Sequence, residues 1–303
     1  MCKVKILVAQ HKEAEVFQDE TYMPIHVGKA ISKIDLGIIG DDTGDNISSL
    51  NPYYCELTAQ YWAWKNLHNV EYIGLCHYRR YFKTKFSEKN IEREMSDCDI
   101  ILARRLVFRN NILTWYSTGL TPEDISVFHL YMNDLYRNDK DTYENFYFRR
   151  NWLNPANMFI CKKKIFDEFC KWQFGILEDL QSIIPLSPYT RGRRLMGYLG
   201  ESLLPFYAYI KKLRVKEIPL VPMIGDEKEL FNQSFITKIK NNLFFTKGKQ
   251  TFCVPDDYMV GLQADGLIDK INAIKHIKEC DNNFHGGFNP KGLKNISNSW
   301  DLY

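Results

Sequence analysis

The sequence has little net charge, no paired-cysteine motif and no long apolar run, and each absence excludes a class of protein. Its 40 Lys and Arg nearly balance its 37 Asp and Glu, and a net charge of +3 argues against a protein that coats nucleic acid. No C-x-x-C pair occurs among the eight cysteines, so zinc ribbons and thioredoxin-type redox sites are not expected. No stretch approaches the roughly 20 apolar residues that span a bilayer. No P-loop occurs either, which disfavours phosphotransfer.

The cysteines and the amino end indicate the compartment. Several cysteines lie inside apolar runs, where Cys behaves as a small hydrophobic residue, and this usage is typical of a reducing environment. The chain begins with a strand-like run in place of a signal peptide. We therefore expect a cytoplasmic protein.

Short apolar runs alternate with helical patterns over the first two thirds of the chain. This alternation predicts an α/β fold, with a mixed, mainly parallel sheet flanked by helices. After Met223 the sequence changes to a basic segment at 238–249, helical spacing at 265–277 and a tail rich in Asn, Gly and Ser. We interpret 1–224 as the main domain. Residues 225–303 are then a helical appendage that caps it, mediates self-association or touches a membrane surface. The expected strands cover residues 4–9, 22–27, 72–76, 100–103, 159–160 and 215–221, and the expected helices begin near residues 51, 88, 121, 164 and 200.

The stretch Glu71–Phe82 organises the rest of the chain. A buried strand, Tyr72 to Cys76, runs directly into His77, Tyr78, Arg79 and Arg80. Ligands of open α/β sheets bind outside the carboxyl ends of the strands, and Arg matches phosphate oxygens bidentately, so the cluster predicts an anion site. If the strand continues, His77 and Arg79 share one face. The plainer interpretation, with about even weight, is that both arginines pair with surface carboxylates.

A second basic cluster and a lone carboxylate follow much later. Arg191 to Arg194 supplies three more guanidiniums just before Gly197 and Gly200. Glu201 is expected near the start of a helix that runs to about Lys212. A Glu at that position usually stabilises the first helical turn. It is also the best-placed isolated carboxylate for a general base.

The loop Gly40–Ser48 is rich in acidic residues. Asp41, Asp42 and Asp45 suggest a metal, but the spacing fails the calcium-loop pattern, because Asn46 stands where Gly is required. A loop that hydrogen-bonds a ribose or sugar hydroxyls fits as well, and a solvated turn is the third alternative.

Aromatic and histidine side chains supply further candidates. Trp62 and Trp64 cannot both lie on the apolar stripe of the helix that begins at Asn51, so one of them is a candidate for ligand contact. His129, in the helix that begins at Thr121, is by default a core or capping residue. Asp134 lies in the same helix.

Four blocks of sequence are similar to a known family. They are Asn51–Thr58 with Tyr61–Asn66, then Gly74–Phe82, Asn157–Ile160 and Gly197–Glu201. They resemble the bacterial domain of unknown function 4422 family, over roughly residues 3–222. Members occur among capsule, exopolysaccharide and O-antigen synthesis proteins and are regarded as glycosyltransferases. The tail after about residue 225 lies outside the resemblance.

The resemblance implies a GT-A-like, Rossmann-type glycosyltransferase that uses a UDP-sugar. Many GT-A enzymes hold a metal with an acid-x-acid motif where this chain has His77–Arg80. We expect Arg79 and Arg80, helped by His77, to stabilise the leaving diphosphate without a cofactor, in a metal-independent transfer. Glu201 is the expected base of an inverting reaction, with Asp134 and His129 behind it.

The remaining roles follow from position in the matching blocks. The donor sugar rests on the resemblance alone: some members are thought to transfer galactofuranose, which is therefore the leading donor sugar, ahead of galactopyranose or another hexose. The acceptor is expected to be a growing surface polysaccharide or a lipid-linked glycan, at the inner face of the plasma membrane, with self-association as a further expectation. The candidates for the nucleotide and donor sugar are His11, Lys12, Asp41, Asp42, Asp45, Asn46 and Arg194, and those for the acceptor or sugar pocket are Trp64, His129, Asp134 and Asn157.

Besides a nucleotide-sugar hydrolase or phosphotransferase that uses the same anion site, two alternatives remain open at this point. One is a metal-dependent hexosyltransferase that binds Mg²⁺ or Mn²⁺ through Asp41, Asp42 or Asp45. The other is a non-catalytic module that binds an anionic polysaccharide through Arg79, Arg80 and Arg191–Arg194. A binding module would show no affinity for UDP, and it would tolerate replacement of Glu201.

Overall fold

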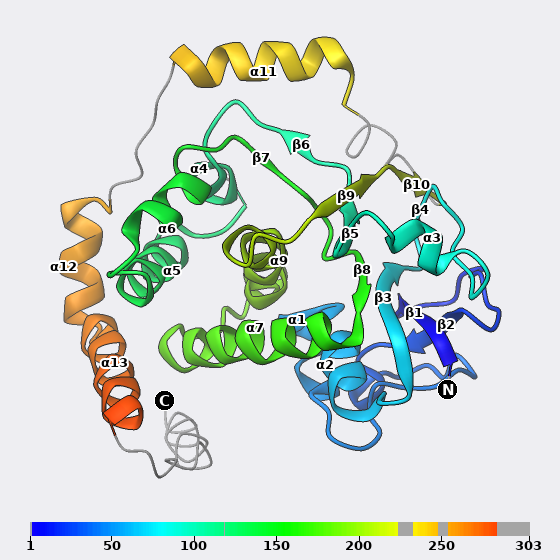
Figure 1. Ribbon diagram of the computed structural model, residues 1–303. Coiled ribbons are helices and arrows are strands. Elements are labelled where there is room, and N and C mark those ends of the chain that lie inside the picture. Colours follow the sequence, from blue (N-terminus) through cyan, green and yellow to red (C-terminus); the bar gives the residue numbers. More distant parts are fainter. Residues whose placement is uncertain (1, 118, 224–232, 248–253, 284–303) are drawn as a thin grey trace.

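The computed structural model describes residues 2–117, 119–223, 233–247 and 254–283 (Figure 1). The strands are β1 Cys2–Gln10, β2 Tyr22–His26, β3 Val70–His77, β4 Arg80–Phe82, β5 Ile100–Ala103, β6 Leu106–Val107, β7 Trp152–Leu153, β8 Phe159–Lys162, β9 Val215–Ile218 and β10 Leu220–Pro222. The helices are α1 Asn51–Tyr54, α2 Leu57–Asn66, α3 Ile91–Met95, α4 Ile112–Ser117, α5 Pro122–Leu135, α6 Lys140–Tyr147, α7 Lys163–Ile183, α8 Thr190–Arg193, α9 Leu195–Ile210, α11 Phe235–Lys247, α12 Asp256–Ala264 and α13 Leu267–Asn283.

The main sheet is mixed and mainly parallel, which confirms the expected fold class. β1 pairs in parallel with β2 and β3, and β5 pairs in parallel with β9. β8 lies antiparallel between β3 and β5, and β4 lies antiparallel between β3 and β10, so six of the eight strands run in one direction and β4 and β8 run against them. The carboxyl ends of β1 and β3 therefore meet at one edge, where an α/β sheet places its ligand.

Apolar layers cover both faces of the sheet. In β1, Leu7 and Ala9 face the helices α2, α7 and α9, whereas Ile6 and Val8 pack on the opposite side with Phe82. This alternation follows from the two-residue period of a strand, and both faces are apolar because both are covered. The helical layer holds most of the core.

The expected last strand, 215–221, is two strands. β9 continues the sheet beside β5, but Pro219 has no N–H to donate and the ladder stops there. The chain then forms β10, which pairs with β4 and aligns Pro222 with Arg80. The segment after α9 therefore supports the strand that carries Arg80.

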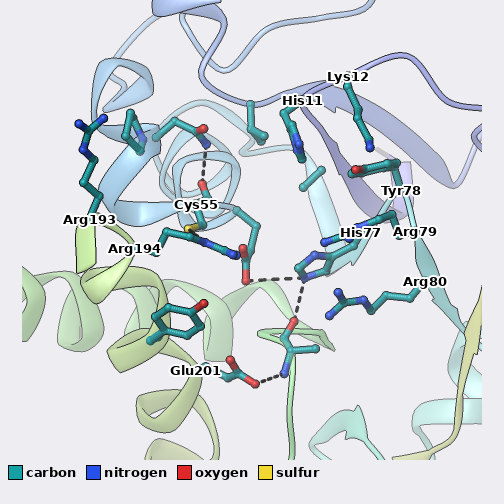
Figure 2. A pocket seen from close by; sticks show the side chains of 17 residues that line it. His11, Lys12, Cys55, His77, Tyr78, Arg79, Arg80, Arg193, Arg194 and Glu201 are labelled. Carbon is teal, nitrogen blue, oxygen red and sulfur yellow. Dashed lines mark hydrogen bonds and ion pairs between the residues drawn. The ribbon is translucent and has the colours of Figure 1, made fainter. Parts of the chain in front are cut away.

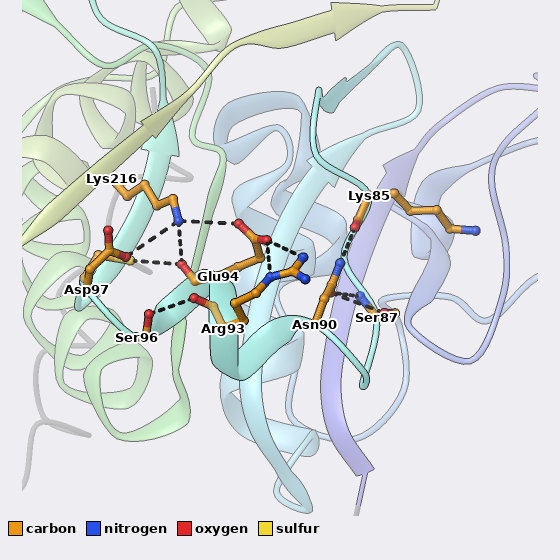
Figure 3. A network of polar contacts seen from close by, with 9 residues as sticks. Lys85, Ser87, Asn90, Arg93, Glu94, Ser96, Asp97 and Lys216 are labelled. Atoms are coloured by element: carbon orange, nitrogen blue, oxygen red, sulfur yellow. Dashed lines mark hydrogen bonds and ion pairs between the residues drawn. The ribbon is translucent and has the colours of Figure 1, made fainter.

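Ion pairs hold the amino end of β5 and the edge strand β9 (Figure 3). Lys216 Nζ lies 3.4 Å from Glu94 Oε2 and 3.6 Å from Asp97 Oδ1. Arg214 binds Asp99, with 2.9 Å between Nη2 and Oδ1. The acid-x-acid pair Asp97 and Asp99 thus ties two strands together, away from the carboxyl ends of the sheet.

The C-terminal helices pack on the body of the protein. α12 and α13 lie against α5 and α7, and Leu262, Leu267, Ile271 and Ile274 join the main apolar core. α11 lies against β6. Within the described ranges, no helix is long and apolar enough to cross a membrane. The Asn-, Gly- and Ser-rich tail is outside the described residues.

Candidate active site

A cavity of about 690 Å³ opens at the carboxyl ends of β1 and β3 (Figure 2). Its walls come from the end of β1, the turn between β3 and β4, the junction of α1 and α2, and the start of α9. Five Arg and Lys side chains, two histidines and two carboxylates line it. The residues that line it are Ala9, His11, Lys12, Val27, Asn51, Pro52, Cys55, Glu56, His77, Tyr78, Arg79, Arg80, Ala156, Arg193, Arg194, Tyr198 and Glu201.

The basic cluster after β3 forms a hairpin. β3 ends at His77, the next two residues turn, and Arg80 begins β4 directly opposite His77. The expectation that His77 and Arg79 share a strand face is therefore wrong, because the chain reverses before Arg79. Opposed residues of an antiparallel pair point to the same side, so His77 and Arg80 are neighbours, as Figure 2 shows. Tyr78 is buried, and Met223 N donates to Arg79 O over 2.7 Å.

His77 is a partly buried, neutral positioning group. Its Nε2 donates to Ala156 O over 2.8 Å, and the same nitrogen lies 3.7 Å from Glu56 Oε1. Burial lowers the pKa of His77 to about 4, and the neighbouring Arg80 acts in the same direction, while Glu56 opposes it. With its pKa lowered to about 4, His77 is neutral near pH 7 and adds no positive charge to the cavity. The expected help of His77 in charge stabilisation does not fit this geometry.

Glu56 is the ionised carboxylate of the pair. Burial opposes its ionisation. The nearby His77 and the hydrogen bond from Asn157 Nδ2, 2.9 Å long, outweigh this effect and hold the pKa of Glu56 below its ordinary value. Asn157 also donates to Gly197 O on α9, over 3.2 Å. Asn157 is almost fully buried and does not line the cavity, so it supports Glu56 from behind instead of contacting a sugar as expected.

Glu201 has the opposite electrostatic character. Burial raises its pKa to about 7, and the nearby Glu56 adds to the effect, although the N–H of Ala156 donates to Glu201 Oε1 over 2.8 Å. Arg80 also draws this pKa down. Two carboxylates with pKa values pushed apart in one cavity are a frequent acid–base arrangement. The helix α9 (Leu195–Ile210) begins six residues before Glu201, earlier than expected, so Glu201 lies toward the middle of the helix instead of near its start.

Close packing of α9 against α1 and α2 brings the two carboxylates together. A Cβ on Gly200 would lie 2.5 Å from Leu57 Cδ1, and one on Gly197 would lie 3.0 Å from Cys55 Sγ. Cys55 has a φ of 53°, which ends α1 and separates it from α2. The single helix expected from Asn51 is therefore interrupted, and the interruption turns Cys55 and Glu56 toward the cavity.

Arg194 and the end of β1 complete the positive wall. Arg194 Nε donates to Cys55 Sγ over 3.2 Å, and its guanidinium lies 5.2 Å from the centre of the Tyr198 ring. Lys12 Nζ lies 6.0 Å from the Tyr78 ring. Burial lowers the pKa of His11, and the charge of Arg79 acts in the same direction. The lasting positive charges of the cavity are therefore its arginines and Lys12. The side chain of Arg191 lies outside the described residues.

The acidic loop does not reach this cavity. Asp41 is fully buried and accepts from Gly28 N over 2.9 Å, from Lys29 N over 3.2 Å and from Ser48 Oγ, so it organises the loop. The other three candidates of the loop, Asp42, Asp45 and Asn46, do not line the cavity either. Among the described residues, no group of three or more His, Cys, Asp or Glu is arranged to hold a metal ion. Asp42 is exposed, Asp45 accepts from Tyr61 Oη and lies 3.9 Å from Lys65, and Asn46 Nδ2 donates to Gly44 O.

Three of the expected sugar-pocket residues lie elsewhere. Trp64 stacks on Phe174 of α7, with 5.8 Å between the ring centres, because its side of α2 faces the core. His129 is 3.0 Å from Tyr143 Oη and belongs to the contact between α5 and α6. Asp134 pairs with Lys275 of α13 over 3.0 Å. None of the three lines the cavity.

Glu56, Ala156 and Tyr198 are the residues of the site that the sequence analysis missed. Glu56 lies inside the Asn51–Thr58 block that resembles the family, and this position is the signal in the sequence that could have identified it as a site residue. Its role depends on the positive φ of Cys55 and on contacts with residues about a hundred positions away, and no local pattern shows either.

Comparison with known proteins now identifies the chain at the level of a family. The sequence profile described as Domain of unknown function (DUF4422) matches residues 5–212. The chain belongs to the DUF4422 family. This DUF4422 protein is also similar to the solved structure titled "WbbM bifunctional glycosytransferase apo structure", with 30% sequence identity and a TM-score of 0.66. The match covers 74% of this chain but 46% of that one, so the protein spans less than half of its structural relative. Among curated proteins, none matches it.

Proposed function

We propose that this DUF4422 protein is a glycosyltransferase that moves a hexose from a UDP-sugar to a glycan. The observation that carries the proposal is one cavity with a wall of arginines and, beside it, a partly buried carboxylate, Glu201, whose pKa is about 7. The similarity to a bifunctional glycosyltransferase supports the same reaction class. A diphosphate would bind the positive wall, and the sugar would lie toward Glu201.

Arg79 and Arg80 would stabilise the leaving group. As the bond between the anomeric carbon and the diphosphate oxygen breaks, negative charge grows on the diphosphate. Positive groups held in place beforehand stabilise that charge most in the transition state. The hairpin holds Arg80 opposite His77, and β10 supports the hairpin from its other side. We propose that these guanidiniums, with Arg194 and Lys12, act without a metal ion.

Glu201 would act as the general base of an inverting transfer. The acceptor hydroxyl oxygen attacks the anomeric carbon, its proton passes to Glu201, and UDP leaves with the electron pair of the broken bond. A base with a pKa near 7 is matched to this task at neutral pH. Glu56 stays ionised, and together with Ala156 it fixes His77 and Glu201 in place.

Galactofuranose is the donor sugar that we propose, and the acceptor is a growing surface polysaccharide or a lipid-linked glycan. The family resemblance supports both choices. The reaction would take place in the cytoplasm, with peripheral contact at the inner face of the plasma membrane.

Release of UDP from a panel of UDP-sugars, UDP-galactofuranose included, tests the proposal. Each donor is assayed with a mixed glycan acceptor, with and without EDTA. We expect one donor to be turned over in EDTA, with turnover lost in Arg79→Ala. The matched control is Arg149→Ala, because Arg149 pairs with Glu144 outside the cavity.

Two outcomes would contradict parts of the proposal. Turnover that EDTA abolishes and Mn²⁺ restores would replace the arginine mechanism with a metal-dependent one. If no donor is turned over and UDP does not bind, the transfer proposal fails and binding of an anionic polysaccharide takes its place.

A further inference from the structure

Helix α11 is attached to the protein through polar side chains. Asn241 is buried and its Nδ2 donates to Val107 O of β6 over 2.7 Å. Gln233, just before the helix, binds both the N–H and the carbonyl of Val107, over 2.8 and 3.0 Å. Asn151 Nδ2 donates to Asn242 Oδ1 over 2.9 Å. These contacts place the amide-bearing side of α11 against the β6–β7 ribbon.

The other side of α11 is apolar and exposed. Phe235 is 76% exposed, Ile236 77%, Ile239 45% and Leu243 60%. Their spacing of three, four and seven residues places them on one stripe. A surface helix of a globular protein normally turns such a stripe inward, whereas α11 turns it outward. A contiguous exposed apolar surface of this kind marks an interaction site. Figure 1 shows α11 along the outside of the β6–β7 ribbon.

The charged residues of α11 itself are all positive. At 100° per residue, Lys238 and Lys240 fall on either side of it, and the helix contains no Asp or Glu. Arg109 adds a further cation, with its guanidinium 4.9 Å from the Phe244 ring centre. Basic residues that flank an apolar stripe are typical of helices that lie in the interface of an anionic bilayer. Two copies of the chain packed stripe to stripe would instead bring these like charges together.

We propose that α11 binds the surface of an anionic phospholipid bilayer. The apolar stripe enters the boundary between headgroups and acyl chains, the lysines contact lipid phosphates, and the amide side remains bound to the β6–β7 ribbon. This proposal goes beyond sugar transfer and does not depend on it, because its readout needs no donor. It names the segment through which the protein reaches lipid.

Co-sedimentation of the full chain with vesicles tests the proposal. One set contains equal parts of phosphatidylcholine and phosphatidylglycerol, and the other contains phosphatidylcholine alone. We expect binding to the anionic vesicles, weakened by high salt, and little binding to the neutral ones. Ile236→Asp and Leu243→Asp should each weaken binding at least about tenfold, since burial of one large aliphatic side chain contributes that much. Lys240→Glu should weaken it about fivefold or more.

The matched control is Val260→Asp on α12. Val260 is 69% exposed, so it tests whether any exposed apolar residue has the same effect. We expect it to bind anionic vesicles as the wild type does. Equal binding by Ile236→Asp, Leu243→Asp and wild type would overturn the proposal. So would a wild-type dimer in sedimentation equilibrium that Leu243→Asp dissociates, since the stripe would then be covered by a second copy. Circular dichroism confirms that each variant is folded.

Discussion

Replacing Glu201 by Gln gives the sharpest test of the candidate base. Gln keeps the size of the side chain and an oxygen that can accept the N–H of Ala156, a bond of 2.8 Å in the wild type. It cannot take up a proton. The variant therefore separates the titration of Glu201 from its packing in α9.

The structure gives the sign and the size of the effect. Burial raises the pKa of Glu201 from 4.5 to about 7, so the folded protein holds a proton that the unfolded chain has lost. The stability that this proton contributes is fully present below about pH 4.5 and is lost as the pH rises through about 7. The difference in pKa corresponds to about 3 kcal/mol. Gln does not titrate, so the variant does not lose this stability as the pH rises. Between the unfolded and folded pKa values of Glu201, the free energy of unfolding of the variant should therefore increase by about this amount relative to wild type.

Urea unfolding at a series of pH values measures this difference, with Glu123→Gln as the control. Glu123 is exposed in the first turn of α5 and lies outside the cavity. If the difference in free energy of unfolding between Glu201→Gln and wild type stays constant from about pH 5 to about pH 8, the prediction that Glu201 titrates in this range is refuted. In the UDP-release assay, wild-type kcat/KM should rise with an apparent pKa near 7. Above about pH 7 the variant should be about 10²–10⁴-fold slower than wild type, and this difference should narrow at lower pH, where wild-type Glu201 is protonated.

Three further predictions concern the walls of the cavity and the loop beside it. Arg80→Ala should lower kcat about 10²–10³-fold, while Arg149→Ala leaves it unchanged, in the same UDP-release assay. His77→Ala should lose activity, whereas His77→Gln should retain most of it, because Gln can still donate to Ala156 O. Equal losses of activity in the two variants would show that His77 does more than position the backbone. Asp41→Ala should lower the free energy of unfolding by about 2–3 kcal/mol, because it leaves buried N–H groups without an acceptor, and EDTA should affect it as it affects wild type.

The sequence predicts most of the fold because its elements are locally encoded. β1 and β5 each contain a run of apolar residues, and Thr121 caps α5 by accepting from Asp124 N over 3.2 Å. The four family blocks also indicate the cavity, since the His77–Arg80 stretch and Glu201 both line it.

What the sequence does not show depends on long-range packing. Glu56 becomes a site residue because Cys55 adopts a positive φ and α9 packs close to it. Trp64 is taken out of the site because Phe174, 110 positions later, stacks on it. The hairpin turn after His77 contains no Gly or Asn, the residues that usually indicate such a turn, so the sequence predicts that the strand continues.

The short strand β10 has a consequence for any shortened form of the protein. The family profile ends at residue 212, yet Met223 N binds Arg79 O and Pro222 pairs with Arg80. A chain cut at the family boundary would lose this support, and it would leave β5 with an open hydrogen-bonding edge that favours aggregation. Domain transplants between DUF4422 proteins should therefore keep the sequence through residue 223, although its last eleven residues lie outside the profile.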